Sequence, residues 1–348
     1  MHRAASFSAK FTNATPPGEI ETTGRFGPWN SDDPGQTPLA ADYTFTNANL
    51  GVFKGIGGIL SSAGKFGGVL DNIEIVGQTD TPDFVVRLSG HPVALHTDFS
   101  ATVDGTNGNT ILHPVNAHFL RSLIVANGEI AKRPGEKGRS IVLDVNTQQA
   151  RMEDLLVMAT KSTDPFMTGA VNLHTKFDLP PGEGDLIERL KLNGAFAVNS
   201  AEFSNPKVNE KVENLSRKGL GKPKDMNAGS GISEMKGQFR LASSILSFRH
   251  LTFAVEGASV NLDGKYGLLS EQVDFHGKLR LEAKLSQTTT GFKSFILRAV
   301  DPFFRKNHAT ELPIKVTGDR SHPSFGLDLH HHESKSEGAE KIAEKTRE

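Results

Sequence analysis

The sequence predicts a mainly β fold, a long curled antiparallel sheet that forms a groove or an open half-barrel, with a few flanking amphipathic helices. Apolar and polar residues alternate over most of the chain, which is the period of a half-buried strand. Gly 35 and Pro 17 provide the turns that many short strands need. With 348 residues, 36% hydrophobic and 23% charged, the chain is long and apolar enough to fold as one large β domain.

One sequence pattern occurs twice and predicts a repeated β-hairpin. The pattern I-x-[IV]-x-G-x4-P-x-F-x-[VL]-x-L runs from Ile73 to Leu88 and again from Ile314 to Leu329. Apolar residues two apart indicate strands, and the short polar stretch between them indicates a turn. We therefore expect both copies to adopt one conformation, with Phe84 and Phe325 on the apolar face of the sheet.

The chain starts with alternating residues, since Phe7, Ala9 and Phe11 already have the spacing of a strand. A second strand follows from Ile20 towards Phe26, and 30–38 is predicted to be a loop. Because the sequence begins within a predicted sheet, we expect it to be the C-terminal part of a longer protein.

Apolar residues three or four apart predict helices at several places. Residues that favour helix ends support some of these predictions. Asp185 precedes a short helix as a capping residue, and Pro206 and Gly219 lie at the two ends of another. The predicted helices are 50–66, a helix capped by Thr147 and ending near Ala159, 185–190, 206–219 and 291–301.

The helix at 291–301 is expected to pack on one end of the sheet as a lid, through Phe292, Phe295, Ile296 and Val300. Contact of its cationic residues with an anionic membrane surface is the alternative. Residues 1–329 form the predicted β domain, with a second loop at about 219–233. The charged segment 330–348 is predicted to be a disordered tail.

From Phe239 onward the alternation is almost continuous and predicts an antiparallel meander with one apolar face. This face is either an ordinary core that helices cover or a groove that stays accessible to something apolar. The residues that would line the groove are Leu251, Phe253, Val255, Val260, Leu262, Phe275, Leu279 and Leu281.

Several function classes are disfavoured. A net charge of -1 gives no field that would attract nucleic acid. Cys 0 removes thiolate ligands and cysteine nucleophiles, and His91 and His96 lie five apart, so a strand would point them to opposite faces. We therefore expect no metal site, no cofactor and no catalytic activity. No run of 18 apolar residues is present, so the sequence predicts no membrane-spanning helix.

Several short sequence segments resemble the C-terminal region of bacterial AsmA-like proteins. They are Gly24-Arg25-Phe26-Gly27-Pro28-Trp29, Phe53-Lys54-Gly55-Ile56, Thr81-Pro82-Asp83-Phe84, Val103-Asp104-Gly105-Thr106-Asn107-Gly108, Asp301-Pro302-Phe303-Phe304 and Pro323-Ser324-Phe325. The resemblance covers most of residues 5 to 329 and rests on structural turns and strands, not on catalytic residues. The N-terminal anchor helix and the preceding repeats of that family are not in this sequence.

The family resemblance implies a protein at the periplasmic side of the bacterial inner membrane, related to TamB and to bridge-like lipid-transfer proteins. It implies a β-groove that binds or conducts the acyl chains of phospholipid between the inner and outer membranes, with envelope membrane proteins as possible partners. The alternative is a periplasmic scaffold or assembly factor for outer-membrane proteins, which would lend sheet edges to client strands.

Overall fold

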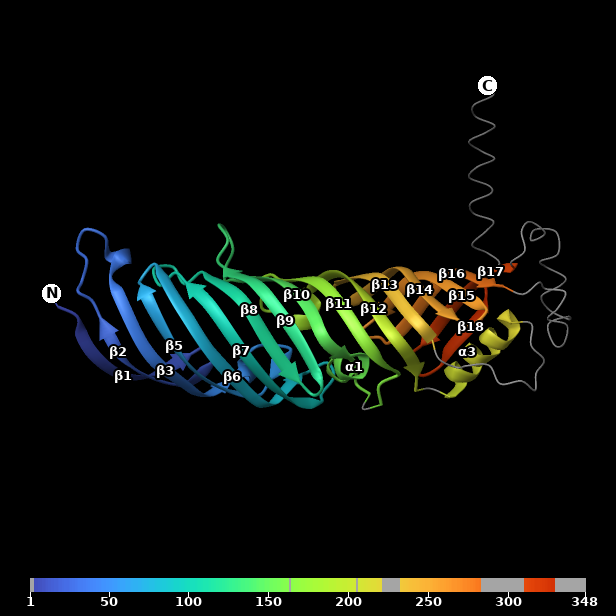
Figure 1. Ribbon diagram of the computed structural model, residues 1–348, viewed down its shortest axis with the longest axis horizontal. Coiled ribbons are helices and arrows are strands. Elements are labelled where there is room, and N and C mark those ends of the chain that lie inside the picture. The colour runs from blue at the N-terminus through green and yellow to red at the C-terminus, as the bar shows by residue number, and fades with distance from the viewer. Residues whose placement is uncertain (1–2, 163, 205, 221–231, 283–309, 329–348) are drawn as a thin grey trace, which may run out of the picture. The chain divides into compact units, whose positions relative to one another are not determined.

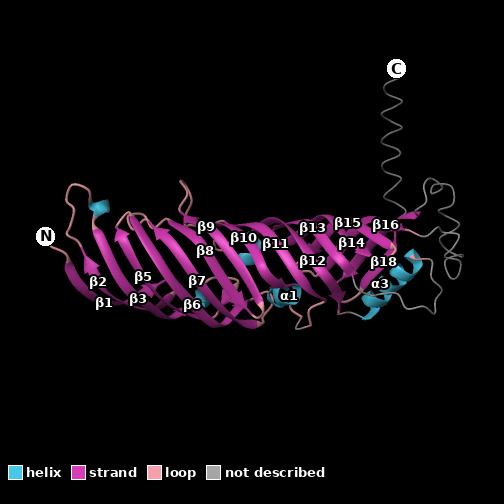
Figure 2. Cartoon of the chain, viewed as in Figure 1, coloured by secondary structure: helices cyan, strands magenta, loops and turns pink. Residues whose placement is uncertain are grey.

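The computed structural model describes residues 3–162, 164–204, 206–220, 232–282 and 310–328. The described chain is mainly β, antiparallel and not closed into a barrel, with few helices, which confirms the predicted fold class. Figure 2 shows strands over most of its length. The chain divides into two compact units, Met1–Phe196 with Arg240–Ser244, and Ala197–Phe239 with Ile245–Glu348.

The first unit is an antiparallel meander in which each strand pairs with its neighbours in the chain, so the colours of Figure 1 run in order across it. The 3₁₀ turns η1 (Pro34–Gln36) and η2 (Leu50–Val52) lie in its loops, and the two-residue β4 is an exception to this order because it pairs with β6. Its strands are β1 (Ala5–Ala14), β2 (Pro17–Phe26), β3 (Pro38–Asn49), β4 (Ile56–Gly57), β5 (Ile59–Val69), β6 (Asn72–Val86), β7 (Pro92–Val103), β8 (Thr110–Phe119), β9 (Ser122–Ala131), β10 (Ser140–Arg151) and β11 (Met167–Leu179).

The second unit contains a further antiparallel meander from β14 to β18. Two other strands, β12 (Lys191–Phe203) and β13 (Ile232–Ala242), contribute residues to both units. The strands of the second meander are β14 (Ile245–Val255), β15 (Ala258–Gly267), β16 (Gln272–Leu281), β17 (Thr310–Asp319) and β18 (Pro323–Leu327).

Three helices connect strands. They are α1 (Met152–Ala159), α2 (Leu186–Arg189) and α3 (Pro206–Gly219). The last two confirm their predictions, and the Asp185 side chain caps α2 by accepting the backbone N–H of Ile187 at 3.0 Å. The expected Thr147 cap is wrong, because Thr147 lies in β10 and α1 starts only after Arg151.

The predicted helix at 50–66 is also wrong. Only η2 is helical there, and β5 occupies most of the segment. Leu60, Ser62, Gly64 and Phe66 are half-buried whereas Ser61, Ala63 and Lys65 between them are exposed, which is the alternation of a strand. The cost of several glycines in a helix is avoided when the same residues form a strand that packs closely on its neighbours.

The repeated pattern forms a hairpin only in its second copy, so the expectation of a structural repeat is wrong. From 314 onward, β17 and β18 pair with each other as predicted. Segment 73–86, in contrast, is part of one continuous strand, β6, which pairs with β5 and β7. In the second copy the Asp319 carboxylate accepts the backbone N–H groups of Ser321 and His322, at 2.8 and 2.9 Å, and this stabilises the turn. The first copy has Gln78 at that position.

Candidate apolar binding surface

One face of the first unit carries an uninterrupted row of small and apolar residues. Because paired strands place their side chains directly opposite one another, the register of the sheet defines which residues are neighbours in this row. We name these ten positions the apolar row. They are Phe7, Gly24, Ala41, Phe66, Ile75, Ala101, Leu112, Gly128, Leu143 and Phe177.

A second row lies two residues further along each strand, on the same face. Thr110 is the single polar member of this second row. The others are Ala5, Phe26, Leu39, Gly68, Ile73, Val103, Ile130, Ile141 and Leu179. Together the two rows form an apolar band that crosses every strand of the meander from β1 to β11 except the short β4.

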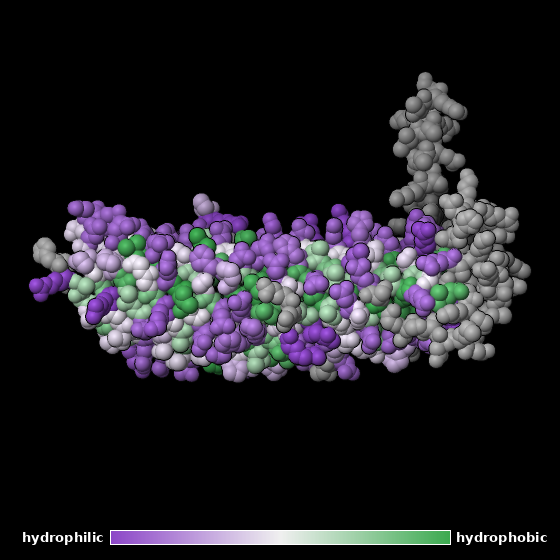
Figure 3. All heavy atoms as spheres, viewed as in Figure 1, coloured by the Kyte–Doolittle hydropathy of each residue, from purple (hydrophilic) through white to green (hydrophobic). Residues whose placement is uncertain are grey.

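The two faces of the sheet differ in polarity. Every residue of the apolar row is buried or half-buried. Next to it on the same strands, the exposed residues of the opposite face include Arg25, Asp42, Lys65, Glu74 and Glu129. In Figure 3, hydrophobic side chains form patches among hydrophilic ones over the strands of the first unit. A sheet with one polar and one apolar face needs something to cover the apolar one.

The length of the apolar row matches an extended hydrocarbon chain. Neighbouring strands lie about 4.8 Å apart, so ten positions span about 43 Å along the surface of the sheet. The hydrocarbon of one bilayer leaflet is about 15 Å deep. An acyl chain therefore fits lengthwise along the row with room for a second one behind it.

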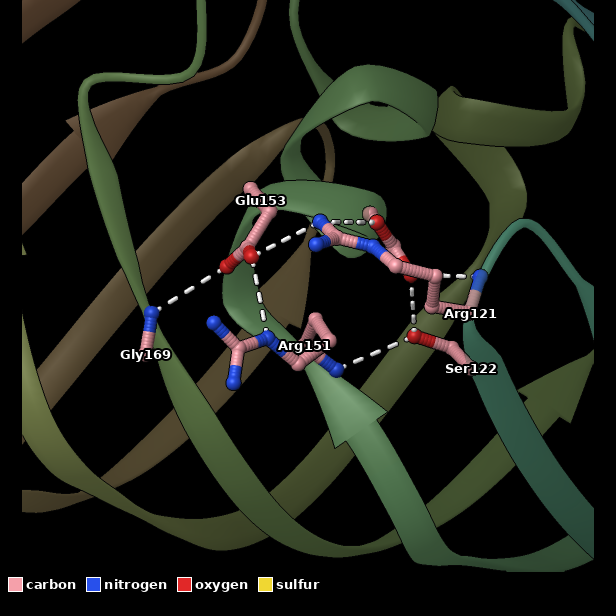
Figure 4. A network of polar contacts seen from close by, with 6 residues as sticks. Arg121, Ser122, Arg151, Glu153 and Gly169 are labelled. Carbon is pink, nitrogen blue, oxygen red and sulfur yellow. Dashed lines mark hydrogen bonds and ion pairs between the residues drawn. The ribbon is translucent and has the colours of Figure 1, made fainter.

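A network of charged residues fixes α1 to this sheet (Figure 4). The Glu153 carboxylate accepts hydrogen bonds from Arg121 at 2.8 Å, from Arg151 at 2.9 Å and from the backbone N–H of Gly169 at 3.1 Å. Asp154 accepts the hydroxyl of Ser122 at 2.8 Å. Both carboxylates are buried. The network joins the β8–β9 turn, β10, α1 and β11.

The environment of Glu153 holds its carboxylate in the charged form. Burial alone would raise the pKa, but hydrogen bonds from the Glu153 backbone N–H, from Arg151 and from Gly169 outweigh it and leave the pKa of Glu153 lowered. The hydrogen bond and the charge of Asp154 raise the pKa of Arg121. The charges of the two carboxylates and the two guanidinium groups neutralise one another. The network therefore has a structural role, and we call it the ionic lock of α1.

The second unit brings together the groove residues predicted from the sequence. The register places Phe253 opposite Val260 and Val260 opposite Leu279, and the other candidates lie on the same face. Val255, Val260, Leu262, Phe275 and Leu281 are buried, whereas Leu251, Phe253 and Leu279 are half-buried.

Helix α3 covers part of this second apolar face. Leu215 of α3 packs against the cluster formed by Val260, Leu262 and Phe275. The rings of Phe248 and Phe275 add a tilted contact with centroids 5.7 Å apart. The cluster therefore has the packing of an ordinary core, and the more accessible apolar surface is the apolar row of the first unit.

Sequence reasoning missed the apolar row because it assigned 50–66 to a helix, which removed β5 from the sheet. The alternation of Leu60, Ser62, Gly64 and Phe66 was the signal that would have restored it. The predicted lid residues Phe292, Phe295, Ile296 and Val300 lie outside the described residues.

Four histidines of the first unit, His91, His96, His113 and His174, make hydrogen bonds. His96 contacts Asp80 through Nδ1 at 2.7 Å, and the pKa of His96 is raised by this hydrogen bond. His118 lies opposite His96, with ring centroids 6.3 Å apart. Across the described part of the chain, His, Asp and Glu side chains form no group of three or more that could hold a metal ion.

Within the described ranges, no helix combines the length and the apolar composition that crossing a bilayer requires. Comparisons of the chain with protein-family models, with curated proteins and with solved structures found no match.

Proposed function

We propose that this chain is a non-enzymatic protein of the bacterial cell envelope that binds phospholipid acyl chains along the apolar row of its first unit, and that it contributes to lipid movement between the inner and outer membranes. The observation that carries the proposal is the row itself, ten small or apolar residues in register from Phe7 to Phe177 on the less polar face of an open sheet.

The energetics of lipid transfer favour such a surface. Moving a sixteen-carbon acyl chain from hydrocarbon into water costs about 13 kcal/mol, at about 0.8 kcal/mol for each CH₂ group. A continuous apolar row avoids most of that cost because the chain never has to enter water completely. A single charged side chain within the apolar row would restore an energy barrier to movement of the acyl chain, since an unpaired charge is costly to desolvate.

The proposed location in the cell envelope is based on the sequence segments that resemble AsmA-like proteins, such as Gly24 to Trp29 and Val103 to Gly108. In the structure these segments are strand ends and the turns that follow them: Gly27 and Pro28 follow β2, and Asp104 to Asn109 connects β7 and β8. The periplasmic side of the inner membrane is the place where a chain of this family would meet phospholipid.

A photoreactive lipid tests the proposal. The full chain is mixed with vesicles of phosphatidylglycerol and phosphatidylethanolamine that contain phosphatidylethanolamine with a photoreactive acyl chain, and the labelled peptides are mapped by mass spectrometry after irradiation. We expect labels on strands that carry the apolar row. Labels confined to the exposed face, or no labels, would contradict acyl-chain binding.

Two variants of neighbouring residues on β8 sharpen the test. Leu112→Asp puts a charge into the apolar row, whereas Ile111→Asp puts the same charge on the other face, where Ile111 is 55% exposed. We expect Leu112→Asp to reduce labelling about ten-fold or more and Ile111→Asp to change it little. Equal labelling of the two variants would exclude the row as the binding surface.

The same preparations distinguish the scaffold alternative. A chain that lends sheet edges to client strands would crosslink to outer-membrane protein strands without lipid, and Leu112→Asp would leave those crosslinks unchanged.

A further inference from the structure

The loop between β9 and β10, residues 132–139, concentrates positive charge, and we name it the cationic loop. It contains four cations and one carboxylate, which are Lys132, Arg133, Lys137 and Arg139, and Glu136. All four cationic residues are exposed, whereas Glu136 is half-buried. Figure 1 shows the loop in green, projecting beyond the ends of the strands. The loop therefore presents its positive charges to whatever approaches this end of the sheet.

The contacts of the loop leave its cations without carboxylate partners. The Glu136 carboxylate accepts the hydroxyl hydrogen of Ser140 at 2.9 Å, and Ser140 is buried. Arg139 donates to two neutral oxygen atoms, the side-chain oxygen of Asn109 at 3.0 Å and the backbone carbonyl of Asn107. Within the described ranges, none of the four cations forms an ion pair with a carboxylate. Their charges are therefore available to an anion from outside the chain.

The base of the cationic loop is fixed to the turn between β7 and β8. The backbone N–H of Lys132 donates to the side-chain oxygen of Asn109 at 3.1 Å, the same oxygen that Arg139 contacts. The nearby Asp104 carboxylate accepts the backbone N–H of Thr106 at 2.9 Å, so it is engaged within its own turn. The loop therefore has a defined position at the end of the sheet.

The other strand connections at this end carry negative charge. Antiparallel pairing places alternate connections at the same end of a sheet, so the cationic loop shares its end with 27–37, 70–71, 104–109 and 180–190. Their charged residues are Asp32, Asp33, Asp71, Asp104, Glu183, Asp185 and Glu188, with Arg189 as the one cation. Among these five connections, only the projecting cationic loop has an excess of positive charge. An anionic surface would therefore contact this end of the sheet at that loop.

The cationic loop starts close to the apolar band. Ile130 of β9 and Ile141 of β10 face each other in the second row of the band, and the next pair, Ala131 and Ser140, is the last before the loop. Lys132 is two residues from Ile130, about 6.6 Å along the strand. A phospholipid has the same order of groups, since its phosphate is joined through glycerol to apolar acyl chains.

We propose that the cationic loop docks on the phosphate groups of an anionic phospholipid membrane, next to the end of the apolar band. This inference rests on the proposed function and deepens it, because it names the surface from which acyl chains reach the band. Lysine and arginine both donate hydrogen bonds to phosphate oxygens. Each such cation close to an anionic membrane strengthens binding about five-fold.

Flotation of the full chain with vesicles in a density gradient tests the proposal. One set of vesicles contains equal parts of phosphatidylcholine and phosphatidylglycerol, and the other contains phosphatidylcholine alone. We expect the unmodified chain to float with the anionic vesicles and much less with the neutral ones. Added salt should weaken flotation, because it screens exposed charges.

The loop variant combines Lys132→Ala, Arg133→Ala and Lys137→Ala. It should bind the anionic vesicles about ten-fold less tightly or worse, because three of the four cations are lost. Arg139 stays in place, since its hydrogen bonds hold the loop on the β7–β8 turn. Urea unfolding followed by Trp29 fluorescence should show unchanged stability, because the three replaced side chains are exposed.

The matched control combines Arg25→Ala, Lys65→Ala and Lys176→Ala. It removes the same number and kinds of cation as the loop variant. These three residues are exposed on the polar face of the sheet, each next to a member of the apolar row. The control should float nearly as well as the unmodified chain. Equal losses in the control and the loop variant would overturn the proposal, because net charge alone would then explain binding.

Leu112→Asp separates this proposal from that of acyl-chain binding. It places a charge in the apolar row and leaves the cationic loop intact, so it should still float with anionic vesicles. The loop variant, in turn, should still be labelled by photoreactive lipid supplied in micelles of a neutral detergent, where no membrane has to be found. Loss of micellar labelling in the unmodified chain would refute acyl-chain binding, and loss of flotation would refute docking.

Three further results would overturn docking by the cationic loop. Unchanged flotation of the loop variant would mean that another segment contacts the membrane. Equal flotation of the unmodified chain with neutral and anionic vesicles would exclude recognition of anionic lipid. Binding to immobilised polyglutamate without any flotation would identify an acidic protein as the partner instead.

Discussion

The backbone N–H of Leu186, at the start of α2, donates a hydrogen bond of 3.1 Å to the carbonyl oxygen of Lys54, which lies between β3 and β4. In the sheet of the first unit, β5 to β10 separate β3 from β11, the strand that precedes Leu186. A flat sheet would place these two strands about 34 Å apart. The sheet of the first unit is therefore strongly curled, and this contact joins loops from distant parts of it.

Gly55 offers a test of this contact. A Cβ atom on Gly55 would meet the Cβ of Leu186 at 2.6 Å, and φ is +101°. We expect Gly55→Ala to lower the free energy of unfolding by about 2 to 3 kcal/mol, in part from backbone strain and in part from steric conflict. Urea unfolding followed by Trp29 fluorescence measures the loss.

Gly90→Ala is the control for Gly55→Ala. Gly90 has a φ of +74°, but no atom lies within 4 Å of the added Cβ. This variant should lose only the strain contribution, about 1 kcal/mol. Equal losses for the two variants would mean that the contact between Lys54 and Leu186 contributes nothing to stability.

The second unit gives a prediction about its core. Val260 is 3% exposed and lies in the cluster beneath Leu215. Val260→Asp should destabilise the second unit by several kcal/mol, because an unpaired carboxylate would be buried there. Hydrogen exchange measured by mass spectrometry should show faster exchange of β14 to β16. The neighbouring exposed Asn261 supplies the control Asn261→Asp, which should keep normal protection. A folded Val260→Asp protein would show that this face is an open groove.

The ionic lock of α1 should be important for stability. Asp154→Ala removes the acceptor of the Ser122 hydroxyl and of the Arg121 backbone N–H, both at 2.9 Å or less. We expect a loss of about 2 to 3 kcal/mol in urea unfolding, because the groups left behind are partly buried. Glu188→Ala, which removes an exposed carboxylate from α2, should cost far less. Similar losses would argue against the lock.

His276 predicts a pH dependence of stability. Its Nδ1 lies 2.7 Å from Asp328 and its Nε2 lies 2.9 Å from Asp274, while Asp263 and Lys315 occupy the facing positions of the adjacent strands. The hydrogen bond to Asp328, followed by that to Asp274, raises the pKa of His276 despite some burial. The protonated ring therefore stabilises the fold, fully below its ordinary pKa of about 6.5, and this contribution is lost as pH rises through the raised folded-state value.

Thermal unfolding between pH 5 and pH 9 measures this effect. The difference in stability between the unmodified chain and His276→Gln should be largest at acidic pH and should decline as pH rises. Asp328→Asn keeps the histidine and removes its shortest contact, so it should reduce the same pH dependence. A constant difference across the range would show that the charge of His276 does not matter.

The sequence predicted the fold class and most of the elements whose signals are local. Asp185 and Pro206 mark helix starts through their own side chains. These features depend on a few neighbouring residues, so they survive whatever tertiary contacts surround them.

Two of the three wrong predictions, the helix at 50–66 and the structural repeat, arise where the same spacing fits two structures. Phe53, Ile56, Leu60 and Ala63 have helical spacing, but pairing of β5 with both β3 and β6 favours the strand. In the pattern shared by 73–88 and 314–329, a single carboxylate at Asp319 makes a turn that Gln78 does not. The alternation in 60–66 would have restored β5 to the sheet, but the alignment of the apolar row across its strands depends on the cross-strand register, which the sequence alone does not supply.

The strict chain order of strands β1 to β11 has a kinetic consequence. Each strand finds its partners among its immediate neighbours, so most native contacts close short loops, and contacts of this kind allow rapid folding by successive addition of strands. Such a sheet can grow as the chain emerges from the ribosome, without waiting for distant segments. The contact between Lys54 and Leu186 is an exception. It can form only after the intervening strands have paired, so we expect it to be one of the last contacts to form when the first unit folds.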